Sequence, residues 1–189
     1  MSEDSQQTGN PAAPAGAMTA AQAQRQVDDG MACIGRSDWE GAMALFVSVE
    51  AALRGIADPE LRIQFARALN GLGFVHLMQA KAERALVEEF DDQAEGAFHW
   101  GVKQALARFN QALSAQTDAR CRSYAEGNKA YALMLMDRVD DATPLLRRLF
   151  GEAGRAAYDG MVRDTALHPI PEDRTVLRLL DEIWDDAGS

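Results

Sequence analysis

The sequence predicts an all-α protein built from antiparallel helical hairpins. From residue 20 onward the apolar residues recur at helical steps of three and four, and no segment alternates apolar and polar residues over the length of a strand. A small residue is also followed three times by alanine twelve positions later, which allows two helices to approach closely. These pairs are Gly30/Ala42, Gly73/Ala85 and Ala130/Ala142.

The first hairpin is expected between residues 21 and 53. Residues 21–34 suit a helix, and Gly35-Arg36-Ser37 makes a tight break after it. Ser37 or Asp38 can cap a second helix, because either side chain accepts a hydrogen bond from a free backbone N–H. That helix is amphipathic, since one face carries Trp39, Ala42, Leu45, Phe46, Val49 and Leu53.

The second hairpin is predicted to contain an insertion. Asp58 and Pro59 form a cap followed by proline at the first helical position, and a long helical pattern follows from Glu60. The pattern turns acidic between about 80 and 101, and we expect its break near 91–96, with the next helix over 101–115. The apolar residues that a repeat of the pattern requires at and after Ala85 are found twenty positions later, at Ala105, Phe109 and Ala112. An insertion would therefore lengthen both helices, unless Ala85 belongs to a separate helix.

Further helices are expected in the last third of the chain, over about 119–136, 140–150 and 152–166. Pro144 is tolerable only in the first turn of the second of these. A last helix, 172–186, has one wet face and suits a terminal cap. Residues 1–19 lack periodicity and are rich in Ser, Gln, Pro, Ala and Gly, so we expect a disordered tail before a single domain over 20–189.

The hairpins resemble the tetratricopeptide repeat (TPR), a family whose unit of about 34 residues is a helix pair with small residues at the crossing. The resemblance covers roughly 21–150, about three units with the insertion in the second. It implies a short α-solenoid that binds a protein or peptide on its concave face, without catalysis. The residues that carry it are Gly30, Trp39, Ala42 and Phe46 in the first unit and Asn128, Ala130, Ala142 and Leu146 in the third.

The composition of the chain indicates which kinds of partner it can bind and in which cellular compartment it occurs. A formal charge of −10 argues against nucleic acid, which needs a clustered basic surface. Cys33 and Cys121 are the only cysteines, which suggests a reducing compartment. The start of the chain has no apolar run of signal-peptide length and no later stretch reaches about 18 apolar residues, so we expect a cytoplasmic protein without a membrane partner.

Sites for chemistry have little support in the sequence. The acidic stretch places Glu88, Asp92, Glu95 and His99 at spacings that could ligate a metal, but it lacks the Glu-x-x-His pairs of di-metal helical bundles. The three histidines are scattered outside any catalytic motif, and Gly71-Leu72-Gly73 lies inside a helical pattern rather than after a strand. We expect no enzyme activity, no metal and no cofactor.

The function favoured at this point is a non-enzymatic adaptor or chaperone. Its candidate contacts along the groove of the first helices are Arg25, Gln26, Asn70, Phe74, Arg122 and Asn128. Phe98 and Trp100, beside the insertion, either pack under it or form an exposed anchor, since tryptophan is common in binding hot spots. The alternative is an acidic inhibitor, such as an immunity protein, whose insertion Glu88–Glu95 neutralises a basic enzyme.

Overall fold

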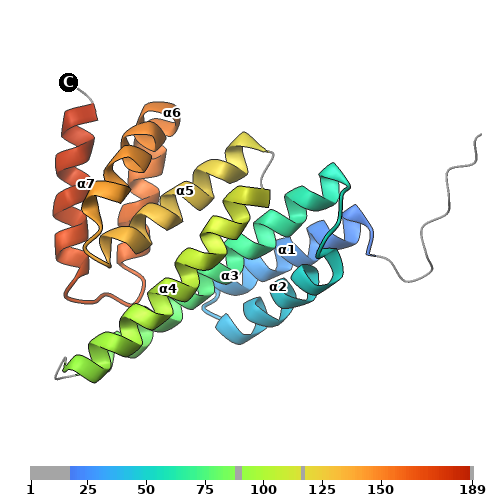
Figure 1. The fold of residues 1–189 in the computed structure, drawn as a ribbon, viewed down its shortest axis with the longest axis horizontal. Coiled ribbons are helices and arrows are strands. Elements are labelled where there is room, and N and C mark those ends of the chain that lie inside the picture. The colour runs from blue at the N-terminus through green and yellow to red at the C-terminus, as the bar shows by residue number, and fades with distance from the viewer. Residues whose placement is uncertain (1–17, 88–90, 116–117, 188–189) are drawn as a thin grey trace, which may run out of the picture.

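The protein is all-α, as predicted. The computed structural model describes residues 18–87, 91–115 and 118–187, and within these residues there are seven helices and no strand (Figure 1). The helices are α1 (Ala20–Gly35), α2 (Trp39–Leu53), α3 (Pro59–Ala85), α4 (Asp92–Ala115), α5 (Ala119–Met134), α6 (Val139–Thr165) and α7 (Asp173–Ala187).

Helix starts follow the capping residues of the sequence. Asp38 accepts a hydrogen bond from the backbone N–H of Gly41, and Asp58 caps α3 with Pro59 in its first turn. Thr19 forms a capping box with Gln22 at the start of α1, so this residue belongs to the helix cap rather than to the predicted tail. Residues 1–17 of that tail lie outside the described part of the chain.

The second hairpin is lengthened in both of its helices, which confirms the predicted effect of the insertion. α3 has 27 residues and α4 has 24, whereas α1 and α2 have 16 and 15. The predicted break at 91–96 was wrong. Asp91 accepts a hydrogen bond from the N–H of Ala94 at 2.8 Å, and this cap allows α4 to begin at Asp92, well before residue 101.

Glycines of α1 and α3 allow these helices to approach two phenylalanine rings, one on α2 and one on α4. A Cβ atom added at Gly30 or Gly71 would lie 2.6 or 2.5 Å from the ring of Phe46, and one at Gly73 would lie 2.4 Å from the ring of Phe109. The pair Gly73/Ala85 is not a helix crossing, because Ala85 is exposed at the end of α3. The residues predicted to replace it, Ala105, Phe109 and Ala112, are fully buried.

α6 contains the two helices predicted for its range, joined at a kink. Gly154 adopts φ 60° and ψ −147°, a conformation that only glycine adopts readily, and Figure 1 shows the two segments of α6 running in different directions. Pro144 lies in the second turn rather than the first, where it is exposed to solvent. The segment after Gly154 packs with α7 as a C-terminal helix pair.

Each hairpin packs on the next along the chain. α3 contacts α1, α2, α4 and α5, and α5 contacts α3, α4 and α6, whereas α7 packs on α6 (Figure 1). One cluster of buried side chains lies among α1, α2 and α3, and a larger one joins α3 to α7. Helix α3 therefore contributes to both cores and connects the two ends of the molecule.

A buried ion pair fixes the start of α7 against α3 and α5. The Lys81 side chain is fully buried, and its Nζ lies 3.1 Å from Asp173 Oδ2 and donates to the Tyr131 hydroxyl at 2.5 Å. Tyr131 donates in turn to Asp173 Oδ1 at 2.5 Å, and the N–H of Ile170 donates to Asp173 Oδ2 at 2.9 Å. The ammonium also donates to the backbone carbonyls of residues 164 and 165 at 3.3 Å. The buried ammonium of Lys81 is therefore compensated by contacts with a carboxylate, a hydroxyl and two backbone carbonyls.

Further contacts near this ion pair also hold the C-terminal helix pair and the loop before α7 against the rest of the molecule. Arg84, one turn after Lys81 on α3, pairs with Glu172 at 3.0 Å. The loop before α7 also reaches the first hairpin, where the ring of His168 lies 5.6 Å from that of Trp39 at the start of α2. The C-terminal helix pair is therefore held by the lengthened part of α3 and touches residues more than a hundred positions earlier.

Burial sets the ionisation of the groups in this network. It lowers the pKa of Lys81, against the opposing attraction of Asp173, and it raises the pKa of Tyr131. Burial also raises the pKa of Asp164 to about 6, although the nearby charges of Lys81 and Arg163 act in the other direction. At neutral pH, Asp164 therefore carries a charge that its surroundings disfavour.

Gly73→Ala should destabilise the protein by about 1–3 kcal/mol, since its methyl group would overlap the Phe109 ring and force the core to shift. Gly96→Ala is the matched control, because it is a helical glycine of α4 with nothing within 4 Å of an added Cβ; it should stabilise by about 0.5–1 kcal/mol. Urea unfolding measures both. Equal effects of the two substitutions would contradict the close α3–α4 approach.

Lys81→Met should destabilise the protein by about 3–5 kcal/mol, because Asp173 would keep a buried charge without its cation. Lys103→Met, at an exposed position of α4, should change the free energy of unfolding by less than about 0.5 kcal/mol. Thermal and urea unfolding of the two variants give the comparison. A Lys81 variant as stable as the Lys103 variant would show that the buried pair does not hold α7.

Asp164→Asn should stabilise the protein above pH 6 and have little effect near pH 4. The folded-state pKa of about 6 lies above the ordinary value of 3.8, so the folded form of the wild type binds a proton more readily than the unfolded form between these values. The wild type therefore gains stability as the pH falls through 6, and the variant lacks that gain. We expect an advantage of about 1–2 kcal/mol at pH 8, measured as the difference between the two urea-unfolding curves.

Candidate partner-binding site

The residues predicted along the first helices lie on α1, α3 and α5. Asn70 of α3 and Asn128 of α5 meet, with the Asn128 amide donating to Asn70 Oδ1 at 3.1 Å. Phe74 is half-buried against the larger core cluster, so only part of its ring is available to a partner. Arg25 and Arg122 are exposed, on α1 and α5. The structure thus joins two of these residues directly and leaves the two arginines at the surface.

Gln26 of α1, another of the predicted contact residues, has a buried polar atom. Its Oε1 atom is buried and has no hydrogen-bond partner among the residues that the structure describes. A buried amide oxygen of this kind is disfavoured by about 1–3 kcal/mol when it stays unpaired. This oxygen is therefore a weak point in the packing of α1.

The aromatic pair beside the insertion is divided between core and surface. Phe98 is 4% exposed and packs in the larger core cluster, whereas Trp100 is 65% exposed on α4. The pair is therefore split, with Phe98 in the core and Trp100 exposed, while the anchor role of Trp100 stays a prediction. Trp100 is the residue that remains available to a partner.

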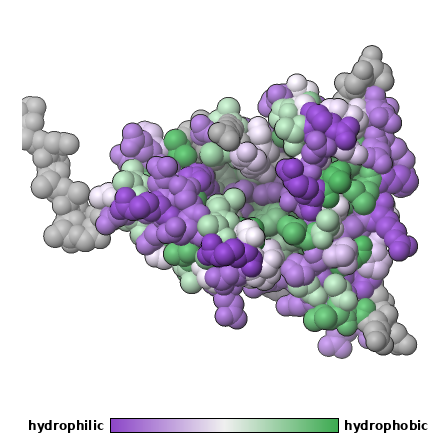
Figure 2. All heavy atoms as spheres, turned by 180° about the vertical axis from the view of Figure 1, so that it is seen from behind, coloured by the Kyte–Doolittle hydropathy of each residue, from purple (hydrophilic) through white to green (hydrophobic). Residues whose placement is uncertain are grey.

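Hydrophilic and hydrophobic residues alternate on the back of the molecule. Figure 2 shows a hollow near the middle of this face, with hydrophobic residues inside it and hydrophilic residues along its border. The hydrophobic areas visible there are separated by hydrophilic residues. Partner contacts on this face would therefore be mostly polar.

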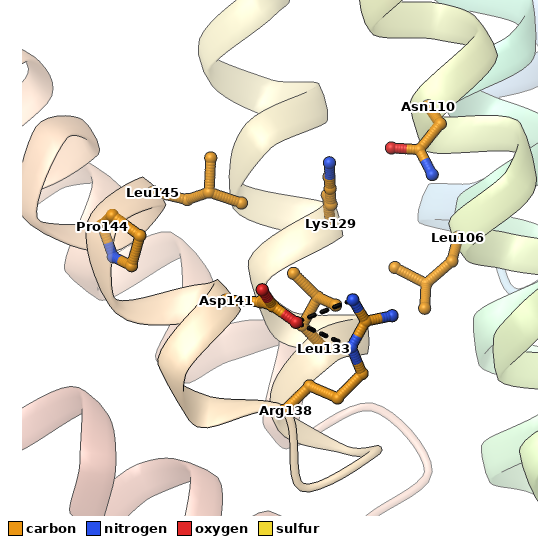
Figure 3. A pocket seen from close by; sticks show the side chains of 8 residues that line it. All are labelled: Leu106, Asn110, Lys129, Leu133, Arg138, Asp141, Pro144 and Leu145. Atoms are coloured by element: carbon orange, nitrogen blue, oxygen red, sulfur yellow. Dashed lines mark hydrogen bonds and ion pairs between the residues drawn. The ribbon is translucent and has the colours of Figure 1, made fainter.

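A cavity of about 220 Å³ lies on one side of α4. Figure 3 shows α4 and α6 on opposite sides of it, with Lys129 and Leu133 of α5 between them. Arg138 and Asp141, 2.7 Å apart, form an ion pair at its end. The remaining lining residues are Leu106, Asn110, Pro144 and Leu145.

A larger groove of about 820 Å³, here named the α2–α4 groove, lies on the other side of α4. On α3 it is lined by Phe65, which is half-buried, and by Leu69, which is only 2% exposed, and Asn110 borders both this groove and the smaller cavity. Its other residues come from the C-terminal end of α2 and the C-terminal half of α4, namely Glu50, Arg54, Gln104, Ala107, Arg108, Gln111, Ser114 and Ala115. The groove therefore combines an apolar part with amide and guanidinium donors.

Glu50 organises the charges of the α2–α4 groove. It is only 7% exposed, and its Oε1 accepts from Arg54 at 3.0 Å and from Arg108 at 2.9 Å. Arg108 also donates to Gln111 at 3.2 Å, which helps to fix its position. Two guanidinium groups share one carboxylate oxygen, so these three side chains carry a positive excess. Burial, with a smaller contribution from the positive charge of Arg108, lowers the pKa of nearby His76.

Helical spacing places two exposed apolar residues in line with this groove. Trp100 precedes Gln104 and Ala107 by four and seven positions on α4, so the three share one helix face. On α2, Val47 precedes Glu50 by three positions and is 46% exposed. Each of the two helices therefore carries one exposed apolar residue about one turn beyond the groove.

Sequence reasoning identified Trp100 but missed the charged residues of the groove. Glu50 and Arg108 are 58 positions apart and meet only because α2 and α4 pack on the same helix. No local motif in the sequence signals this meeting. Arg54 could have been found as the i,i+4 partner of Glu50, although such a pair on a helix is usually plain surface.

Among the described residues, no three potential metal ligands come together. His99 Nδ1 and Glu95 Oε1 are 4.0 Å apart, Asp92 is exposed, and Glu88 lies outside the described residues. Lys81, Tyr131 and Asp173 are enclosed by the protein, so a substrate could not reach them. Within the described chain, no helix has an apolar stretch that could span a membrane.

The chain was compared with models of protein families, with curated proteins and with solved structures. None of the three comparisons finds a match.

Proposed function

We propose that this protein is a non-enzymatic interaction module, an adaptor or a chaperone, that binds a segment of another protein. The observation that carries the proposal is the α2–α4 groove with the exposed Trp100 beside it. Aromatic residues and arginines dominate the energetics of protein interfaces, and here both occur next to an apolar depression. The groove is the best candidate for the binding site.

The composition of this surface suits a protein partner better than a small molecule. The α2–α4 groove runs along the ends of two helices, and its border carries the amides of Gln104, Asn110 and Gln111. An apolar centre with a polar border is the usual arrangement of a protein interface. Arg54 is tethered to Glu50 while its side chain is 74% exposed, so fewer degrees of freedom would be lost on binding.

The packing order of the helices supports a TPR-like stack of hairpins as the scaffold. α3 packs on both helices of the first hairpin, and α5 packs on both helices of the second. Such stacks present extended surfaces for protein partners and need no bound group. The face around Asn70 and Asn128 is a second surface of the same scaffold, and we propose a cytoplasmic setting for the whole protein.

The alternative, an acidic inhibitor of a basic enzyme, is favoured by one observation. Asp91, Asp92 and Glu95 are exposed at the α3–α4 turn, where their charges can reach a partner. In that case the contact surface would be the tip of the second hairpin rather than the α2–α4 groove. The two proposals therefore differ in which residues the binding requires.

Trp100→Asp should lower the amount of partner recovered by affinity purification from the native cell more than tenfold, since truncating a hot-spot tryptophan typically removes about 2 kcal/mol or more. Tyr124→Asp is the matched control, because Tyr124 is 60% exposed on α5 and lies outside the groove. The control should retain the partner. Both variants should keep the wild-type unfolding temperature.

The same purification distinguishes the alternative. If reversal of Asp91, Asp92 and Glu95 to lysine removes the partner while Trp100→Asp retains it, the protein acts through its acidic turn. If neither Trp100→Asp nor the reversal changes the proteins recovered, both proposals for the surface are wrong.

A further inference from the structure

We infer that the α2–α4 groove receives an acidic amphipathic helix of the partner, with a carboxylate at Arg54 and Arg108 and apolar residues over the half-buried Phe65 and over Trp100, which lies on α4 beyond the groove. This inference rests on the proposed function and specifies its partner. It states what kind of segment binds. The charges of the groove, its shape and the exposed apolar residues beside it each limit that kind.

The charge of the groove selects an acidic side chain. The two nitrogens that donate to Glu50 Oε1 lie within about 6 Å of each other, so two positive groups are held close together over one carboxylate. A guanidinium has five N–H donors in a planar fork, and one contact with Glu50 leaves others directed elsewhere. A second carboxylate, supplied by the partner, can accept two of them in parallel and cancels the positive excess.

The preference for an acidic side chain comes from Arg54 and Arg108 and not from the charge of the whole chain. The whole chain carries a formal charge of −10, which opposes the approach of an acidic segment at long range. Arg54 and Arg108 must therefore supply the attraction at short range, where solvent screening is weaker. It follows that reversing one of these charges should strongly weaken binding.

The shape of the site selects a helix. Trp100, Gln104, Ala107 and Gln111 follow one face of α4 over eleven positions, which is about 16 Å or three helical turns. Val47 and Arg54 span a similar face on α2. An amphipathic helix lying between two helices can place residues i, i+3, i+4 and i+7 against such a groove. Strand addition to a sheet, the other common mode of peptide binding, would need a sheet edge, and the described residues form no strand.

The test uses the full chain and a phage library of random 16-residue peptides. Selection should enrich peptides of net negative charge with apolar residues at i, i+3 or i+4, and i+7. Binding of the most enriched peptide, synthesised with a fluorescent label, is then measured by anisotropy. Arg54→Glu should weaken this binding at least tenfold, while replacing the acidic residues of the peptide with lysine should restore binding to the variant.

Arg178→Glu provides the matched control, since Arg178 is a similarly exposed arginine that pairs with a glutamate four positions away, on α7. It should change the affinity less than twofold, and thermal unfolding should show both variants folded. Enrichment of basic or neutral peptides, or binding that Arg54→Glu leaves intact, overturns the inference without touching the proposed function. The absence of any enriched peptide overturns it as well, whereas the proposed function depends separately on the Trp100 purification.

Discussion

The fold depends on how the Lys81 ammonium is satisfied away from water. A charge in that position is stable only when its partners are supplied together, and here they come from α5, the end of α6 and the start of α7. Because Asp173 also accepts from Tyr131 and from the N–H of Ile170, displacing α7 would leave several buried groups unpaired at once. One ion pair thereby determines where the C-terminal helix pair attaches.

This attachment gives the insertion in the second hairpin a structural role. The added turns of α3 carry Lys81 and Arg84 to the C-terminal helix pair, and the added turns of α4 place Phe98 in the core. Of the acidic residues that made the insertion conspicuous in the sequence, Asp91, Asp92 and Glu95 are exposed at the start of α4. The same added segment holds Trp100 outside the core, so one change in helix length contributes both to the packing and to the candidate site.

In the α2–α4 groove, too, a nearly buried charged side chain determines the positions of its neighbours. Glu50 is nearly buried and paired twice, and this fixes the two arginines where they border the groove. A fixed guanidinium loses less conformational entropy on binding than a free one. Residues of α2, α3 and α4 line the groove together, so the site forms only when these three helices pack.

The sequence by itself determined the helices, their caps and the lengthening of the second hairpin, because periodicity and capping act within a few residues. Asp38, Asp58 and the buried set around Phe109 were all found in this way. Only the tertiary structure decided that Ala85 is exposed, that α6 turns at Gly154, and that Lys81 meets Asp173 and Glu50 meets Arg108. The two ion pairs join residues that are distant in the chain, and their meeting depends on how whole helices pack rather than on any local pattern.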